Sequence, residues 1–182
     1  MSSIQTGRFS IEVVHSKLIS ETIRKEIISL CNRAYEENME SLFDTFVKPS
    51  HILGYCDGVL VSHALWVTRY LQAGTNPIMR TAYIEAVATD TNYRNRGFAK
   101  SIMNHLIGEI QDYELAALSP FSVEYYERLG WELWRGTLYI RTNENLLTSP
   151  EDEEVMIFRL PKTPSLDLNA SLSAEWREGE LW

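Results

Sequence analysis

The chain has 182 residues, of which 45% are hydrophobic and 11% aromatic, enough for one domain with a substantial core. Its formal net charge of −8 argues against nucleic acid as a partner, because phosphate backbones are bound by an excess of Lys and Arg. We see no signal peptide and no apolar run that would span a bilayer, so we expect a single cytoplasmic domain over residues 1–182 without a membrane partner.

The first third of the chain predicts a strand, two helical stretches and a β-hairpin. The strands alternate apolar and polar residues, and the helical stretches repeat apolar residues at helical spacing. Asp57-Gly58 is typical of a two-residue type I′ turn, so it should join the two hairpin strands. In chain order these elements cover residues 9–15, 17–37, 39–47, 51–56 and 59–70.

The polar side of the second helical stretch is acidic. It offers Glu37, Glu40 and Asp44, together with Asn38. Such residues usually form a solvated face. They are also suited to one wall of a site for a cation, and we take Glu37 as the candidate there.

The stretch from Tyr83 to Ile110 predicts a strand that runs through a basic turn into a helix. The strand covers 79–89, and apolar residues at helical spacing follow over 98–110. Such a turn presents backbone N–H groups and the positive end of a helix dipole, so it favours an anion such as phosphate. Gly97 lets a phosphate approach the backbone closely. The alternative is a basic loop that only caps an ordinary helix.

The second half predicts one more helix and further strands. A buried strand over 113–118 should lead into a helix with Ser119 as N-cap, Pro120 at the first position and Gly130 just past its end. The tail from residue 161 carries two tryptophans among its last seven residues, so we expect it to fold back onto the domain. Strands at 131–141 and 155–160 flank a polar loop at 142–154. The fold class is therefore α/β (α+β), a mixed, mostly antiparallel sheet flanked by helices.

Neither the cysteines nor the histidines show a spacing typical of a metal or redox site. We expect Cys31 and Cys56 to be reduced core thiols, and we predict no metal site.

Two motifs resemble the GNAT acetyltransferase superfamily. Arg94-x-x-Gly97-x-Ala99 resembles its pyrophosphate-binding pattern, Gln/Arg-x-x-Gly-x-Gly/Ala. The segment from Tyr126 to Trp131 resembles its Tyr-x-x-x-Gly-Phe/Trp element, in which a helix carries a tyrosine near the thioester sulfur. The resemblance covers most of the chain from residue 9 to 160. It implies the GNAT fold, acetyl-CoA as co-substrate and direct transfer of acetyl to an amine in a ternary complex.

A closer resemblance is to the aminoglycoside 2′-N-acetyltransferases. Residues 83–88, Tyr-Ile-Glu-Ala-Val-Ala, are similar to the Tyr-Val-Glu-Gly-Val-Ala strand of that family. Residues 176–182, Trp-Arg-Glu-Gly-Glu-Leu-Trp, are similar to its Trp-Arg-x-Gly-Asp-Val-Trp ending. Ala86 and Glu180 depart from the family's Gly and Asp, and these departures bear on substrate range.

The resemblance and the charges of the turn together give the candidate site residues. For acetyl-CoA they are Val87, Ala88, Thr89, Arg94, Asn95, Arg96, Gly97, Phe98, Ala99 and Lys100. For a cationic small-molecule acceptor they are Glu37, Glu85, Ala86, Ser119, Glu151, Asp152, Glu180 and Trp182 with its carboxylate.

Glu85 and Tyr126 are the candidate catalytic residues, and both would transfer protons. Glu85 is the candidate general base, acting through a water, and its alternative is a carboxylate that only attracts the ammonium. Tyr126 is the candidate general acid, and its alternative is a packed core tyrosine. Tyr125 would then be the misleading neighbour, since the two point about 100° apart on a helix. The backbone N–H of Val87 would polarise the thioester carbonyl.

The resemblance favours antibiotic resistance by acetylation of an aminoglycoside 2′-amine. Two other hypotheses stay open: an acetyltransferase for another polyamine or amino-sugar metabolite, and an aminoglycoside-binding protein without catalysis. Exposed strands would permit a homodimer.

Overall fold

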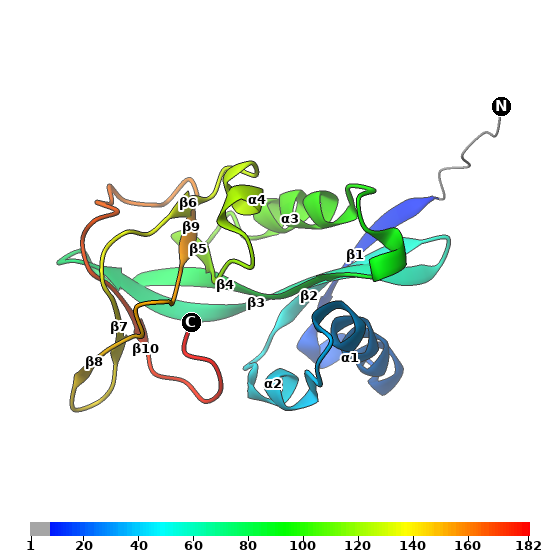
Figure 1. Cartoon of the computed structure of the whole chain (residues 1–182), viewed down its shortest axis with the longest axis horizontal. Helices are drawn as coiled ribbons and strands as arrows, with labels where there is room; N and C mark the ends of the chain where they lie inside the picture. The colour runs from blue at the N-terminus through cyan, green and yellow to red at the C-terminus, as the bar shows by residue number, and fades with distance from the viewer. Residues whose placement is uncertain (1–7) are drawn as a thin grey trace.

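A computed structural model describes residues 8–182, in which one mixed sheet separates two layers of helices (Figure 1). The strands are β1 (Phe9–His15), β2 (Ser50–Cys56), β3 (Val59–Ala73), β4 (Met79–Thr89), β5 (Leu115–Leu118), β6 (Glu132–Leu133), β7 (Leu138–Arg141), β8 (Leu146–Thr148), β9 (Met156–Arg159) and β10 (Leu172–Glu175). The helices are α1 (Glu21–Tyr35), α2 (Glu40–Thr45), α3 (Phe98–Glu109) and α4 (Val123–Glu127), with short 3-10 turns η1 (Ser16–Leu18) and η2 (Thr91–Tyr93).

The sheet order is β6-β9-β5-β4-β3-β10-β7-β8, with β2 also paired to β3 and β1 to β2. The β4–β5 and β10–β7 pairs are parallel, and the other pairs are antiparallel. This confirms the predicted fold class.

The sheet divides the buried apolar side chains into two cores. One lies under α1 and α2 and includes Ile27, Leu30 and Phe43. The other lies under α3 and α4 and includes Ile102 and Tyr126. Figure 1 shows α3 and α4 above the sheet and α1 and α2 below it. Burial on both faces explains why the central strands carry long apolar runs.

The predicted hairpin between β2 and β3 is confirmed at its turn. Asp57 has φ +50° and Gly58 has φ +79°, the two left-handed residues that a type I′ turn requires. The start of α1 is fixed by Ser20, whose side chain accepts a hydrogen bond from Ile23 N at 3.2 Å.

The strands β4 and β5 separate soon after they meet. Their parallel pairing covers only Thr81–Tyr83 against Leu115–Ala117, whereas β4 runs on to Thr89. The second half of β4 therefore has no partner on that side, and a cleft between the strand ends becomes accessible to a ligand.

A β-bulge interrupts β4 at Ala86. The register between β3 and β4 shifts between His63 and Leu65, and Ala86 has a left-handed φ of +49°. Tyr83 and Ala88, five positions apart, both pack in the core under α1 and α2, although a regular strand would place them on opposite faces. Because β4 has one extra residue here, the side chains after the bulge point to the opposite face from the one that a regular strand would give them.

Three sequence predictions about the second half of the chain are wrong in detail: a helix start, a strand and a loop. Ser122, not Ser119, caps α4, because its Oγ accepts from Tyr125 N at 3.3 Å while residues 119–122 form a loop. The predicted strand 131–141 is two strands, since the chain turns at Gly136 against the Ala170 backbone before β7 pairs with β10. The predicted loop 142–154 contains β8, which pairs with β7.

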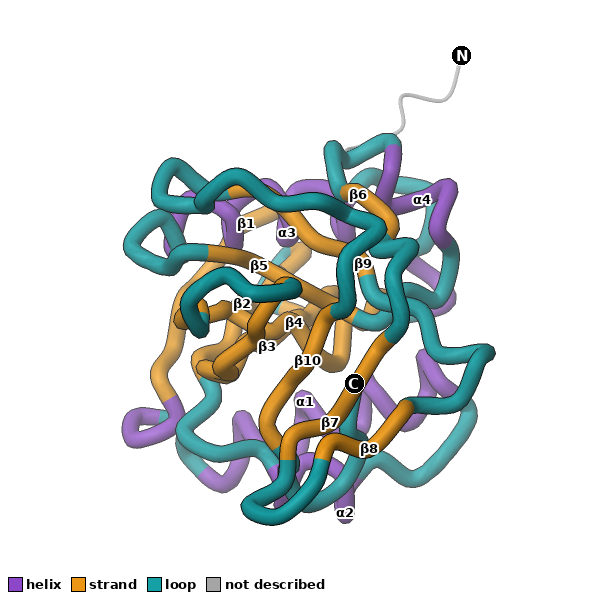
Figure 2. The backbone as a smooth tube through the Cα atoms, turned by 90° about the vertical axis from the view of Figure 1, so that its left-hand side faces the viewer, coloured by secondary structure: helices purple, strands orange, loops and turns teal. Residues whose placement is uncertain are grey.

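The C-terminal tail, residues 161–182, packs into the sheet. Its strand β10 lies between β3 and β7 (Figure 2), although no periodic pattern predicts a strand there. Arg69 of β3, 1% exposed, holds the end of β10 and the segment beyond it: its guanidinium donates to Glu175 O at 2.7 Å and to Leu181 O at 2.5 Å. A buried guanidinium needs such acceptors, so the tail and β3 stabilise each other.

No helix within residues 8–182 is long and apolar enough to cross a membrane.

Candidate active site

The basic turn, residues 94–97, leads directly into α3. Gly97 is the N-cap residue with φ +81°, and a Cβ built on it would meet no atom within 4 Å. Ser101 N bonds back to Gly97 O at 3.0 Å, so the N–H groups before it point out of the helix end. The turn combines backbone N–H donors that make no bond within the helix, the positive end of the α3 dipole and open space, and a bound phosphate requires all three.

A cavity of about 670 Å³ extends from this turn along the free half of β4. All of the predicted cofactor residues line it except Arg96, whose guanidinium lies 5.0 Å over the Tyr93 ring. Arg94 lines the cavity and also donates to Ala34 O at 3.2 Å, which ties the turn to the end of α1. The remaining lining residues are Ala34, Tyr35, Tyr93, Phe121 and Tyr125.

Glu85 lies on β4 just before the bulge. Its Oε1 accepts a hydrogen bond from Arg177 Nη2 at 2.5 Å, and the two side chains are 10% and 17% exposed. Burial raises the pKa of the Glu85 carboxyl, and the Arg177 guanidinium opposes that rise. Arg69 lowers the same pKa more weakly, whereas Glu180 raises it. The Glu85 carboxyl is thus buried next to cations, and such an environment can adjust the pKa of a general base.

Tyr35, the last residue of α1, contacts β4 two residues after Glu85. Its hydroxyl donates to Val87 O at 3.0 Å. Burial raises its pKa, and nearby Cys31, Tyr126, Glu85 and Glu180 raise it further. The Tyr35 phenol is therefore neutral and lies within electrostatic range of both predicted proton-transfer residues.

The two tyrosines of α4 occupy different positions. Tyr126 is 2% exposed, and burial followed by neighbouring Tyr125 raises its pKa. Tyr126 raises the pKa of Tyr35, so the two phenols lie within electrostatic range of each other. Tyr125 lines the cavity, and its hydroxyl is buried without a hydrogen-bond partner among the described residues. Both phenols are protonated at neutral pH.

Glu153, in the loop before β9, lies within electrostatic range of Asp152 and of Glu180 in the tail. Burial raises the pKa of Glu153, and the neighbouring Asp152 and Glu180 raise it further. Glu180 also acts on Glu85, so these carboxyls form one negative region next to the buried ion pair. The described contacts do not bring Glu37, Ser119 or Glu151 into it, since these exposed side chains make no hydrogen bond or salt bridge with residues 8–182.

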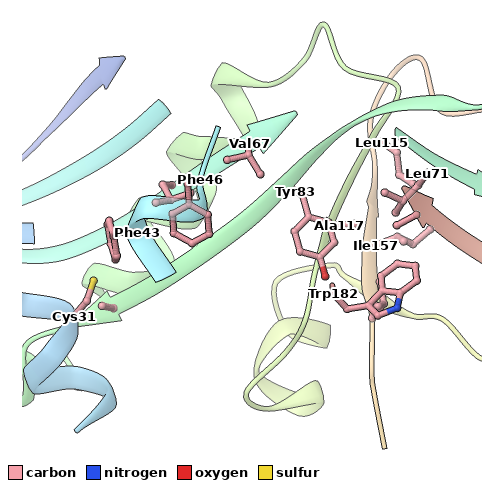
Figure 3. Close-up of a cluster of buried hydrophobic side chains, with 14 of the residues drawn as sticks. Cys31, Phe43, Phe46, Val67, Leu71, Tyr83, Leu115, Ala117, Ile157 and Trp182 are labelled. Carbon is pink, nitrogen blue, oxygen red and sulfur yellow. The ribbon is translucent and has the colours of Figure 1, made fainter. Parts of the chain in front are cut away.

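The side chain of Trp182 is structural. It is 4% exposed, and its Nε1 donates to Ser149 Oγ at 2.6 Å. Figure 3 shows the indole beside Tyr83, whose hydroxyl points toward it. The packing holds the end of the chain, with Glu180, close to Glu85.

Sequence reasoning missed Tyr35, Glu153 and Arg177. Arg177 belongs to the family-like ending, so its position was visible, but nothing local predicts that it reaches across the sheet to Glu85. Tyr35 ends a helical stripe and Glu153 lies in an acidic loop, and both patterns are typical of solvated surface.

Comparisons of the sequence with known proteins show which family the chain resembles. A family model described as acetyltransferase (GNAT) domain matches residues 16–134. An aminoglycoside 2′-N-acetyltransferase from Mycolicibacterium fortuitum is 31% identical over 131 residues, which cover 69% of this chain and 67% of that protein.

Solved structures share the fold. YhbS, a GNAT family N-acetyltransferase from Escherichia coli solved in complex with CoA, gives a TM-score of 0.67 at 16% identity, covering 98% of this chain and 94% of that one. A probable N-acyltransferase from Enterococcus faecalis V583 gives a TM-score of 0.56 at 20% identity, over 71% of this chain. This chain spans only 33% of that longer protein.

Proposed function

This chain belongs to the GNAT acetyltransferase family, whose members use acyl-CoA, and from that premise we propose that it moves the acetyl group of acetyl-CoA to the 2′-amine of an aminoglycoside. The membership confirms the predicted resemblance to the GNAT superfamily. The choice of acceptor is supported by the 31% identical relative and by the residues around Glu85.

One observation carries the proposal. Glu85 lies two residues before Val87, which lines the cavity from the basic turn, and Glu180 of the tail is close enough to raise the pKa of the Glu85 carboxyl. A thioester held in the cavity would then meet an amine held by the carboxyls. Such positioning of two reactants is worth about 7–11 kcal/mol of the barrier.

The cavity suits acyl-CoA. The absence of a Cβ at Gly97 and the free N–H groups of the turn fit a diphosphate, and Lys100 adds charge beside it. When bound, acetyl-CoA supplies an activated acetyl thioester. Phe121, 72% exposed, and Tyr125 offer aromatic surface at the other wall.

The acidic region suits a polycation. Asp152, Glu153 and Glu180 concentrate negative charge on a chain with a net charge of −8. Clefts of one sign raise the local concentration of ligands of the opposite sign. An aminoglycoside carries several ammonium groups, so the surrounding carboxyls would bind those that do not react.

We assign three roles to residues of this chain. Glu85 accepts the proton of the attacking amine through a water, because burial raises the pKa of its carboxyl while Arg177 opposes that rise. The N–H of Val87 donates to the oxygen that gains charge, since it lies on the unpaired edge of β4. Tyr126, neutral and within electrostatic range of Tyr35, returns a proton to the leaving sulfur.

A thiol-release assay tests the function. Purified protein with acetyl-CoA and a thiol-reactive dye should release thiol when an aminoglycoside with a free 2′-amine is added, and the product should carry acetyl on that nitrogen by NMR. An aminoglycoside with a 2′-hydroxyl should give no release. Release only with other polyamines or amino sugars would replace the proposed acceptor. Binding without release would make the protein a non-catalytic binder.

A further inference from the structure

Three side chains hold the bulge of β4 from outside the strand. Three consecutive carbonyls each accept a hydrogen bond from a side chain: Ala86 from His63, Val87 from Tyr35 and Ala88 from Ser62. The distances are 2.9, 3.0 and 3.1 Å. In a regular ladder such groups would pair with the neighbouring strand. Ala88 is still paired with His63 in the β3–β4 ladder, whereas Ala86 and Val87 have no partner residue on β3, and the His63 side chain donates to the carbonyl of Ala86.

His63 is fully buried and its ring orientation is fixed. Because the Ala86 carbonyl only accepts, Nδ1 of His63 must carry the proton, and Nε2 must then be an acceptor. His51 Nδ1 lies 3.0 Å from that Nε2 and donates to it. His51 is itself 4% exposed, so the two imidazoles form a buried chain from β2 through β3 to the bulge.

The pair is neutral near neutral pH. Burial lowers the pKa of His51 to about 4 and, with His51 nearby, lowers that of His63 to about 3. The groups that face the pair are Cys31 of α1, with Sγ 3.8 Å from His63 Nδ1, and Phe43 of α2, whose ring centroid is 6.0 Å away. Neither group carries a charge that would favour the protonated imidazole, so the hydrogen bonds alone set the tautomer of each histidine.

Ala86 needs such support. It has φ +49°, a conformation that glycine adopts freely and alanine adopts only under strain. The residue before it is Glu85, and the residue after it supplies the N–H on the open edge of the strand. A relaxed Ala86 would remove the extra residue from the register and turn the Glu85 carboxyl away from the acidic region.

We propose that His63, oriented by His51, is a positioning residue for acetyl transfer: its N–H on the Ala86 carbonyl holds the bulge that aims Glu85 at the acceptor and Val87 N–H at the thioester. This inference rests on the proposed function for its catalytic consequence. We call the hydrogen bond from His63 to the Ala86 carbonyl the clamp. Its effect on the β4 backbone can be measured without any enzyme activity.

Substitutions at His63 test the kinetic consequence. His63→Leu should lower kcat about 10–100-fold, the range expected for a reacting group displaced by about 1 Å, with KM for acetyl-CoA nearly unchanged. His63→Asn keeps a donor near the Nδ1 position and should retain more kcat than His63→Leu. Ala86→Gly in the His63→Leu background should recover kcat, because glycine holds a positive φ without a clamp. His105→Leu, on the exposed side of α3, is the matched control and should behave as wild type.

Hydrogen exchange tests the clamp directly. Amides of residues 85–88 should exchange faster in His63→Leu than in wild type, and Ala86→Gly should restore their protection. Equal exchange and equal kcat per folded molecule in wild type and His63→Leu, with folding checked by circular dichroism, would overturn the inference. If wild type turned over no amine, the proposed function would fail, and the exchange result alone would then decide for or against the clamp.

Discussion

Arg177 Nη2 lies 2.5 Å from Glu85 Oε1, so the last turn of the chain supplies the counter-ion of a carboxyl 92 positions earlier. The pair is mostly buried, at 17% and 10% exposure of the two side chains. A single cation beside a buried carboxyl sets how readily that carboxyl loses its proton. The tail is thereby coupled to the chemistry that we propose for β4.

Removing the charge of Arg177 should shift the pH dependence of turnover. Burial raises the Glu85 pKa and Arg177 lowers it, so Arg177→Gln leaves burial less opposed and the pKa rises further. The base then becomes protonated at a higher pH. We expect the acid limb of kcat/KM to move to higher pH, measured with a fixed amine across the stable range. Arg177→Lys keeps the charge and should shift it less. Superimposable profiles for all three proteins would remove Arg177 from this role.

Tyr126 and Tyr125 offer a matched pair on one helix. Tyr126→Phe should lower kcat at neutral pH by about 10²–10⁴-fold, because it removes the proposed acid while leaving the ring packed. Acetyl-CoA affinity by calorimetry should change little. Tyr125→Phe should keep most of kcat, since its hydroxyl has no partner within the described chain. The reverse order of the two effects would make Tyr125 the acid.

Gly97 and Gly58 separate phosphate binding from backbone strain. Both have φ near +80° and both have open space where a Cβ would stand. Alanine at either position should destabilise the fold by about 1–2 kcal/mol. Only Gly97→Ala should also weaken acetyl-CoA binding, since its Cβ would meet the diphosphate. Equal acetyl-CoA affinity of the two variants by calorimetry would remove the turn from the binding site.

Loss of the last two residues should affect the acceptor and not acetyl-CoA. Deletion of Leu181 and Trp182 removes a buried indole and one acceptor of Arg69, so the free energy of unfolding should fall by about 3–5 kcal/mol. Amine affinity should fall, and acetyl-CoA affinity should hold at temperatures where the variant is folded. Glu180→Gln is the milder variant and should weaken the amine alone. Unchanged amine affinity in both would exclude the tail from the acceptor site.

The buried histidines should make the fold acid-sensitive. Their pKa values in the folded protein, about 4 and about 3, lie below the ordinary 6.5 of an unfolded chain. Their stabilising effect is therefore complete above about pH 6.5 and is lost as the pH falls from there to about 4 for His51 and about 3 for His63. Each histidine should contribute a slope of up to about 1.4 kcal/mol per pH unit in that window. Urea unfolding at several pH values should show a shallower slope for His51→Phe, and an equal slope would contradict the assignment.

Local sequence patterns were enough for the elements that depend on local physics. The spacing of Phe98 to Ile110 predicts α3, and Asp57-Gly58 predicts a turn that needs two positive φ angles. The strand β10 could not be predicted, because four residues carry too little periodicity and their state depends on pairing with β3 and β7.

The candidate site was predictable only where a family motif marks it. The basic turn follows from its glycine and its charges, and all of it except Arg96 lines the cavity. The bulge could not be predicted, since alanine at position 86 is the wrong residue for a left-handed conformation and its carbonyl accepts a hydrogen bond from His63 on another strand. The ion pair between Glu85 and Arg177 depends on how the tail crosses the sheet.

A crystal structure with CoA and an aminoglycoside bound would test the central claim most directly. We predict that the diphosphate contacts the N–H groups of the basic turn and α3, with the sulfur beside Tyr126 and the 2′-nitrogen between that sulfur and Glu85. A diphosphate bound away from Gly97, or an amine bound away from Glu85, would contradict the account.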